Sequence, residues 1–195
     1  AGNIIKPKIS KLKLDLRGLF YIPRIVKASK LGDAAILKVL IKILSENKIK
    51  VIKLNTFNPE LTLKKGVYTK IKPNLLEKKD ISKGIRTLKK INSYNHTQAV
   101  IIRNNKVISR ESRTGTKEMI KSVPKSKIKK GILIKMPKAK QDLRVDLPTI
   151  GIDTFKDCNK VGIKGIVVKS NQNIILNKEV CIKYANQNKL FLISI

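Results

Sequence analysis

The last third of the chain alternates between short apolar runs and amphipathic segments, and this pattern limits the possible folds more than any other feature of the sequence. Strands are expected at 163–169, 173–176 and 190–195, and helices at 154–160 and 178–187. Strands that alternate with helices bury their apolar side chains when the helices cover a sheet. The pattern therefore predicts a layered α/β or α+β domain.

The middle of the chain adds further elements to this domain. The expected elements are a helix at 80–94, a hairpin with strands at 98–103 and 107–111 joined by Asn104 and Asn105, a helix at 116–123 and a buried strand at 131–136. The preceding region, from Asn55 to about residue 79, is polar and is interrupted by Pro59, Gly66 and Pro73. We therefore expect a domain boundary near Asn55.

The first 54 residues are less regular. Residues 1–7 have the pattern of a strand end, and a connector with one apolar side is expected at 12–26, where Pro23 interrupts it. A helix then begins at Gly32-Asp33, and a strand is expected at 48–54. The apolar residues of this helix recur at helical spacing: Leu37, Leu40, Ile41 and Leu44.

The chain is strongly basic, because 44 Lys and Arg residues oppose 13 Asp and Glu residues and give a formal net charge of +31. Such a charge is typical of proteins that bind nucleic acid or an acidic membrane. Compositional drift toward Lys, Ile and Asn explains it equally well. The cations are spread along every segment and aromatic residues make up only 4% of the chain, which argues against a specific nucleic-acid site. Binding to duplex DNA is expected to be weak and sensitive to salt.

The cysteines and the histidine argue against metal or redox motifs. Cys158 and Cys181 lie far apart in apolar stretches, so we expect two buried, reduced thiols. His96 is the single histidine, and a zinc site is therefore not expected. Because no stretch approaches the roughly 20 apolar residues that span a bilayer, and no signal sequence opens the chain, a cytoplasmic location is expected.

A charged segment near residue 144 is the strongest candidate for chemistry. If 141–147 is a strand, Asp142, Arg144 and Asp146 project from one face and three apolar residues from the other. Two carboxylates beside a cation suit divalent-metal phosphoryl chemistry. In a straight strand the acids would stand about 13 Å apart, so one metal could not join them without a bend. The alternative is a solvated face with local ion pairs.

Two further segments could hold a phosphate at the start of a helix. One runs from Glu111 through Gly115 to Thr116, and the other contains Asp33. In each case the alternative is ordinary helix capping, by Thr114 or Thr116 in the first segment and by Asp33 in the second. No Walker A sequence, dinucleotide-binding glycine motif or serine nucleophile elbow is present in the sequence.

These segments carry a family resemblance. The sequence QDLRVDLPTIG at 141–151, preceded by GILIK at 131–135, resembles the signature of the I-type UDP-2,3-diacylglucosamine pyrophosphatases, the LpxI family of lipid A biosynthesis. Supporting similarities cover essentially the whole chain. They are Ala1-Gly2 with Pro7, Arg17-Gly18-Leu19, Gly32-Asp33, Glu111, Gly115-Thr116, 162–168 and 190–193. Ala34 and Thr114 stand where this family commonly has acidic residues.

The resemblance implies a specific activity and a specific set of residues. The enzyme would be a UDP-2,3-diacylglucosamine diphosphatase that uses Mg²⁺ or Mn²⁺ and releases UMP and 2,3-diacylglucosamine 1-phosphate. Asp146 and Asp142 are the expected catalytic acids and metal ligands. The expected substrate-binding residues are Gln141, Arg144, Lys135, Glu111, Gly115, Thr116 and Asp33. A homodimer, peripheral to the cytoplasmic side of the inner membrane and without a specific nucleic-acid partner, is also implied.

The resemblance also implies a domain organisation. Residues 1–54 would be the C-terminal remainder of a Rossmann-like N-terminal domain, and residues 55–195 a complete α/β (α+β) catalytic domain. The family's glycine-rich opening of roughly 80 residues has no counterpart in the sequence, which opens with Ala1, so we expect that part to be missing. The alternatives are a basic nucleic-acid-binding protein and a fragment without catalytic activity.

Overall fold

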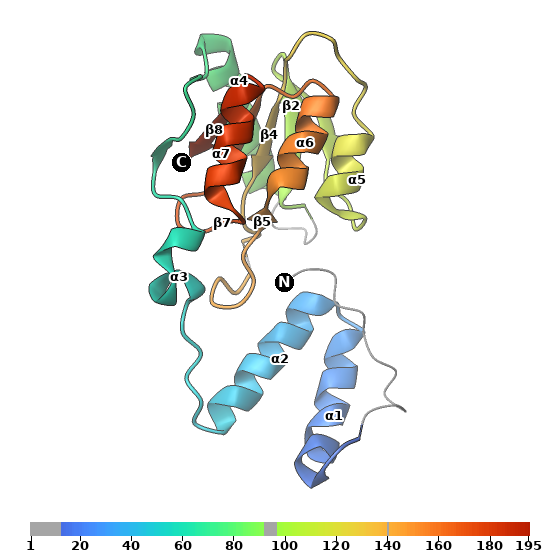
Figure 1. Cartoon of the computed structure of the whole chain (residues 1–195). Helices are drawn as coiled ribbons and strands as arrows, with labels where there is room; N and C mark the ends of the chain where they lie inside the picture. Colours follow the sequence, from blue (N-terminus) through green and yellow to red (C-terminus); the bar gives the residue numbers. More distant parts are fainter. Residues whose placement is uncertain (1–12, 92–96, 140) are drawn as a thin grey trace. The chain divides into compact units, whose positions relative to one another are not determined.

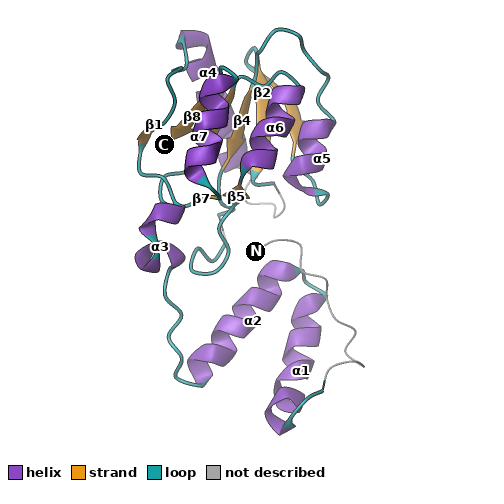
Figure 2. Ribbon diagram, in the orientation of Figure 1, coloured by secondary structure: helices purple, strands orange, loops and turns teal. Residues whose placement is uncertain are grey.

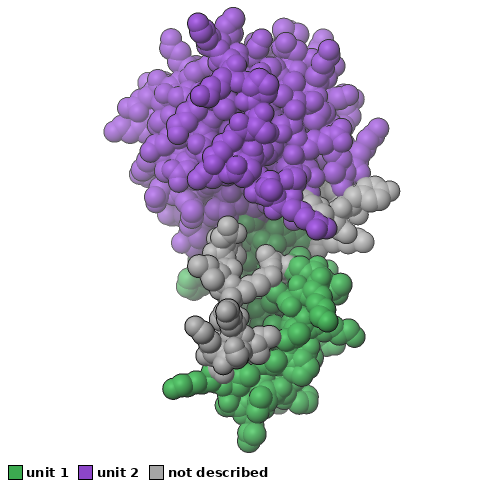
Figure 3. Space-filling model, turned by 90° about the vertical axis from the view of Figure 1, so that its right-hand side faces the viewer, with its two compact units in different colours: residues 1–57, 141–147 green, residues 58–140, 148–195 purple. Residues whose placement is uncertain are grey.

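The computed structural model describes residues 13–91, 97–139 and 141–195, apart from the side chain of Asp33. The chain forms two compact units, shown in separate colours in Figure 3. Unit 1 contains residues 1–57 and 141–147, and unit 2 contains residues 58–140 and 148–195. The return of 141–147 to unit 1 was not indicated by the sequence.

Unit 2 is built on a six-stranded mixed sheet (Figure 2), in the order β1-β8-β6-β4-β2-β3. Three adjacent strands, β8, β6 and β4, are parallel, and the remaining neighbours pair antiparallel. A separate parallel pair is formed by β5 and β7. The strands are β1 Gly66–Val67, β2 Ala99–Arg103, β3 Lys106–Arg110, β4 Ile132–Lys135, β5 Thr149–Ile150, β6 Gly165–Val168, β7 Ile174–Ile175 and β8 Phe191–Ser194. The predicted mixed α/β class is confirmed.

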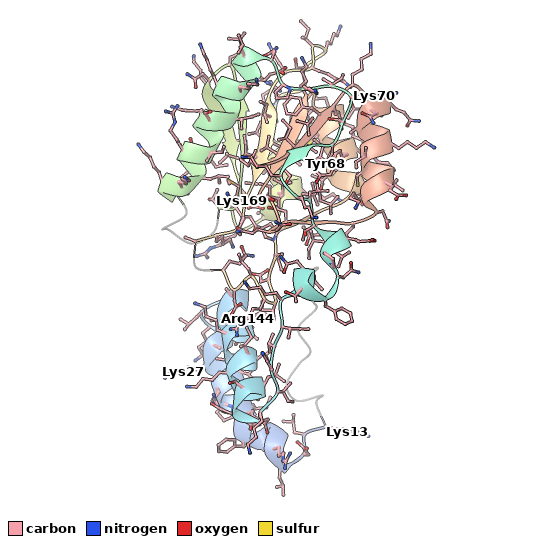
Figure 4. The ribbon with its side chains drawn as sticks, turned by 90° about the vertical axis from the view of Figure 1, so that its left-hand side faces the viewer. Lys13, Lys27, Tyr68, Lys70, Arg144 and Lys169 are labelled. Carbon is pink, nitrogen blue, oxygen red and sulfur yellow. The ribbon has the colours of Figure 1, made fainter. Side chains whose placement is uncertain are left out.

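Helices cover both faces of the sheet in unit 2. On one face α5 (Gly115–Lys121), α6 (Ile152–Lys160) and α7 (Lys178–Gln187) bury Met119, Phe155 and Cys181 against the strands. On the other face α4 (Leu75–Ile91) buries Ile81 and Leu88. Figure 1 shows α5, α6 and α7 side by side, and Figure 4 shows α4 and α7 on opposite sides of the sheet. The result is a three-layer domain.

Local interactions fix two of these elements. The helix α4 begins five residues before the predicted start, because Asn74 and Glu77 cap each other: each backbone N–H donates to the other side chain, at 2.8 and 2.9 Å. The β2–β3 turn has positive φ at Asn104 and Asn105, as a two-residue hairpin loop requires. Both of their N–H groups donate to the carboxylate of Asp80, at 3.1 and 2.5 Å. The predicted hairpin is confirmed.

Residue 165 must be a glycine because of the strand next to it. Gly165 pairs with Phe191 of β8, and the phenyl ring lies over the glycine. A Cβ atom at residue 165 would lie 2.0 Å from two carbon atoms of this ring. The glycine therefore lets a large side chain fill the core between α4 and the sheet.

Unit 1 contains a pair of helices, α1 (Leu16–Ser29) and α2 (Asp33–Glu46). Arg24 of α1 donates two hydrogen bonds to the Glu46 carboxylate, at 2.6 and 2.8 Å, and Ala28 and Ile41 are buried. The expected connector at 12–26 is thus helical over 16–26. Pro23 lies inside α1 and has no backbone N–H to donate within the helix. Packing against α2 offsets the cost of this missing hydrogen bond.

The N-terminal strands are not confirmed. After α2 the chain has a positive φ at Lys48, and the Ile49 N–H donates to the Leu44 carbonyl at 2.9 Å, so a left-handed residue ends the helix. Residues 49–53 then continue without regular structure into the short helix α3 (Leu54–Phe57), which makes the predicted strand at 48–54 wrong. The described part of unit 1 contains helices and turns but no strand, and it does not confirm a Rossmann-like domain.

Two sequence predictions cannot be compared with the structure, because the strand end expected at 1–7 and His96 lie outside the described residues. Of the helices in the described ranges, none combines the length and the apolar content that a membrane crossing demands. The remaining short element of unit 2 is a 3₁₀ helix, η2, at Pro59–Leu61.

Candidate functional site

The pairing of β2 with β3 and β4 brings Glu111 and Lys135 to the same face of the sheet in unit 2. Lys135 ends β4 and pairs with Ala99, while the Glu111 N–H, just after β3, donates to the Ala99 carbonyl at 3.0 Å. The two residues therefore lie on either side of one strand, about 10 Å apart at the backbone. Their long side chains can meet above Ala99.

Thr116, in the first turn of α5, lies between these two side chains. The Lys135 ammonium donates to the Thr116 hydroxyl at 2.5 Å, and the hydroxyl donates its own proton to Oε1 of Glu111. The other carboxylate oxygen accepts the Gln98 N–H at 2.9 Å. A hydroxyl has a single proton to donate, so the chain of hydrogen bonds runs in one direction, from the ammonium through the hydroxyl to the carboxylate.

The two charged groups joined by these hydrogen bonds, the Lys135 ammonium and the Glu111 carboxylate, are almost completely buried. The side chains of Lys135 and Glu111 are 7% and 3% exposed, and Nζ lies 3.9 Å from Oε1, too far for a direct hydrogen bond. Burial lowers the pKa of Lys135; the Glu111 charge acts against this, and Lys138 lowers the pKa further. Buried charges are costly unless they are paired, so the hydroxyl bridge is central to keeping the ammonium in place.

A buried asparagine holds the backbone at the same edge of the sheet. Asn173 is 1% exposed; its Nδ2 donates to the Lys135 carbonyl at 3.2 Å, and its Oδ1 accepts the Lys169 N–H at 2.9 Å. Lys169 follows β6 and is labelled in Figure 4. Asn173 therefore ties together the carboxyl ends of two parallel strands, which is where open α/β sheets usually bind ligands.

The start of α5 contains the residues predicted to hold a phosphate. Gly115 has a φ of +89°, and Thr114, at the cap position, makes no capping hydrogen bond with its side chain. The Thr116 hydroxyl is directed to Glu111. Neither threonine side chain therefore provides the helix cap that was the alternative to phosphate binding. Phosphate binding by Gly115 and Thr116 stays a prediction.

The signature segment in unit 1 forms a turn, so the condition on which the charged strand face depended, a strand at 141–147, is not met. The N–H groups of Val145 and Asp146 donate to the Asp142 carbonyl at 3.2 and 2.9 Å. The Arg144 side chain folds back onto Asp142, with Nε to Oδ1 at 3.0 Å and Nη2 to Oδ2 at 2.7 Å. The acids and Arg144 therefore do not alternate along one strand face, and the spacing of about 13 Å does not apply.

The two acids of this turn have different surroundings. Hydrogen bonds from Arg144 lower the pKa of Asp142, and the Lys38 charge from α2 contributes to the shift. The alternative of local ion pairs thus describes Asp142 and Arg144. Arg144 is labelled in Figure 4. Asp146 is partly buried and makes no ion pair with any described residue. Gln141 is partly buried, and Asp33 begins α2.

The predicted site residues thus form two groups. Lys135, Glu111, Gly115 and Thr116 come together in unit 2. The second group belongs to unit 1 and contains Gln141, Asp142, Arg144, Asp146 and Asp33. Sequence reasoning missed Gln98 and Asn173, whose roles depend on strand pairing. Gln98 has a buried side-chain oxygen for which no described residue is a hydrogen-bond partner.

Comparisons with known proteins agree with the resemblance. The model of the LpxI N-terminal domain matches residues 1–61, and the model of the LpxI C-terminal domain matches residues 64–193. A protein from Caulobacter vibrioides, the UDP-2,3-diacylglucosamine pyrophosphatase LpxI, is 28% identical over 203 residues, which cover 100% of this chain and 72% of that protein.

These matches settle the classification. Both domains of the family are represented, by residues 1–61 and 64–193, so neither domain is absent as a whole. The C-terminal match alone spans well over half of the chain and contains both the hydrogen-bonded cluster of unit 2 and the signature turn. The chain belongs to the LpxI family.

Proposed function

We propose that the chain hydrolyses the pyrophosphate bond of UDP-2,3-diacylglucosamine and releases UMP and 2,3-diacylglucosamine 1-phosphate for lipid A biosynthesis. The match to both family domains carries this proposal, and the activity named for the Caulobacter relative supports it. In this reaction water attacks the sugar-side phosphorus, and UMP leaves. Little covalent chemistry is required of the protein, so positioning and charge neutralisation supply most of the rate.

Two groups of side chains support this chemistry. Lys135 presents a buried cation at the carboxyl edge of the sheet, where it can neutralise a phosphoryl oxygen. In the signature turn, Asp146 is the carboxylate without an ion pair to a described residue and is suited to orient the attacking water. Arg144 and Gln141 are proposed to bind substrate, Arg144 through the guanidinium edge that Asp142 leaves open.

The carboxylates of the turn fit a hard divalent cation. Oδ1 of Asp142 accepts two hydrogen bonds from Arg144 and Oδ2 accepts one, which leaves Oδ2 with a lone pair for a further ligand. With Asp146 this makes two carboxylates, the number that Mg²⁺ commonly uses while it keeps several waters. A bound Mg²⁺ or Mn²⁺ would neutralise pyrophosphate charge and lower the pKa of a bound water.

The substrate also suggests where the protein works. A diacylated sugar nucleotide stays in a membrane leaflet through its acyl chains, so we propose a cytoplasmic enzyme, peripheral to the inner membrane. A homodimer is proposed from similarity to family members. Neither proposal requires a membrane-crossing helix.

The test is UMP release from UDP-2,3-diacylglucosamine by the purified chain with Mg²⁺ or Mn²⁺, and with EDTA. We expect turnover that requires the metal, and a loss of about 100-fold in kcat for Asp146→Asn with its fold intact. The matched control is Asp157→Asn, an acid that pairs with Lys160 at 3.7 Å on α6. No UMP release above background by the wild type would refute the proposed activity. Normal turnover by Asp146→Asn would refute only the role of this acid.

A further inference from the structure

The Lys135 ammonium has more hydrogen-bond donors than the described part of unit 2 uses. A lysine ammonium has three N–H groups, and among the described residues only the Thr116 hydroxyl accepts one at hydrogen-bond distance. Yet the side chain is only 7% exposed. A buried cation with unused donors is costly unless an anion completes it. This combination is typical of a preformed anion site.

Glu111 has the opposite character. Its Oε1 accepts the Thr116 hydroxyl, its Oε2 accepts the Gln98 N–H at 2.9 Å, and the side chain is 3% exposed. Its backbone carbonyl also accepts the Thr97 hydroxyl at 2.9 Å. The carboxylate is thus directed into the protein and would repel the phosphoryl groups of a substrate if it faced them. A direct contact of Glu111 with substrate is therefore unfavourable.

We propose that Glu111 and Thr116 are positioning residues for the hydrolysis, and that they act through Lys135. Glu111 accepts the only proton of the Thr116 hydroxyl, which leaves the hydroxyl oxygen as an acceptor for Lys135. This orients the ammonium so that its two remaining N–H groups meet phosphoryl oxygens of the substrate. The inference rests on the proposed pyrophosphatase function, and it replaces the expected direct binding of substrate by the Glu111 and Thr116 side chains.

The protonation of Lys135 provides a readout that a structural role would not change. Binding of an anion requires the charged ammonium, whose fraction falls as the pH rises through the lowered pKa of Lys135. The groups that act on this pKa are Glu111, which raises it, and Lys138, which lowers it, with burial as the largest cause of the shift. Removing the Glu111 charge lowers the pKa further, so the rise in KM should begin at a lower pH.

The experiment compares Glu111→Gln, Thr116→Val and Thr116→Ser with the wild type. For each protein, the KM for UMP release from UDP-2,3-diacylglucosamine is measured across pH, and the thermal midpoint is measured on the same sample. A hydrogen bond to a charged group contributes roughly 1.5–3 kcal/mol, so KM should rise about 10-fold or more in Thr116→Val and recover in Thr116→Ser. Glu111→Gln should shift the alkaline rise in KM to lower pH. The matched control is Glu118→Gln, an exposed acid on α5 that pairs with Lys121.

The outcomes separate this inference from the proposed function. An inactive wild-type protein refutes the pyrophosphatase function itself. An active wild type whose Glu111→Gln variant keeps the same KM and pH profile overturns the positioning role, even if its thermal midpoint falls. Glu111→Gln keeps the size of the side chain and one acceptor oxygen, so it remains informative if Thr116→Val does not fold.

Discussion

Asp142 can be tested both as a catalytic acid and as the ion-pair partner of Arg144. Asp142→Asn removes the charge that accepts two hydrogen bonds from the guanidinium, at 3.0 and 2.7 Å. The side chains of Asp142 and Arg144 are 20% and 43% exposed, so water screens their attraction. The stability cost should be about 0.5 kcal/mol, with 1 kcal/mol as a rough upper bound, because exposed pairs contribute little.

The catalytic cost expected for the same change is much larger. Loss of a carboxylate that binds a metal or orients water should reduce kcat about 100-fold, which corresponds to about 2.7 kcal/mol. The thermal midpoint should fall by only about 1–2 °C for a chain of this size, and by about 2–4 °C if the cost reaches the upper bound of 1 kcal/mol. Asp142→Asn should therefore be a folded protein with little activity.

Arg144→Gln is the matched variant, because it breaks the same ion pair from the other side and keeps the Asp142 carboxylate. If Asp142 acts directly in catalysis, Asp142→Asn should be at least about 10-fold slower than Arg144→Gln, a difference of about 1.4 kcal/mol. The assay is initial UMP release at saturating substrate, with calorimetry on the same samples. Equal kcat values for the two variants would refute direct catalysis by Asp142 and leave it as the partner of Arg144.

Three further predictions concern the core of unit 2. Gly165→Ala should destabilise the fold by about 3 kcal/mol in chemical denaturation, and Phe191→Leu should recover part of this loss; additive effects would contradict the contact between them. Asp80→Ala should lower the free energy of unfolding by about 2 kcal/mol, since two turn N–H groups lose a charged acceptor, and Asp80→Asn should cost less. Burial raises the pKa of the Cys158 thiol, and it raises the pKa of the Cys181 thiol to about 11. A thiol reagent at pH 8 should therefore label both cysteines only after denaturation, and rapid labelling of the native protein would contradict their burial.

Elements with strong local signals could be predicted from the sequence. The helix α7 was expected at 178–187, where the structure has Lys178–Gln187, and the hairpin turn followed from Asn104 and Asn105. The start of α4 was missed although its signal was present, since Asn74 and Glu77 have the spacing of a capping box. Without this capping pair, the expected start of the helix lies five residues too late in the sequence.

The signature segment shows why short alternating patterns mislead. The six residues 142–147 alternate between polar and apolar and so fit a strand. In the structure, however, the Asp142 side chain accepts the backbone N–H of Arg144 at 3.0 Å, as well as its guanidinium. Aspartate side chains that bond to the backbone two residues later favour turns over strands. The same acid–base spacing that suggested one charged strand face is therefore also the spacing of a closed turn.

The site in unit 2 shows a different limit. The resemblance singled out Lys135, Glu111 and Thr116 separately, and it implied that each of them binds substrate. Their actual relation depends on β2 pairing with both β3 and β4, a long-range register that a single sequence does not encode in any local pattern. Once that register places Glu111 and Lys135 on either side of Ala99, the hydroxyl between them has one proton and two charged neighbours. The direction of the hydrogen bonds then follows from chemistry, and it leaves Lys135 as the member of the three that can meet an anion.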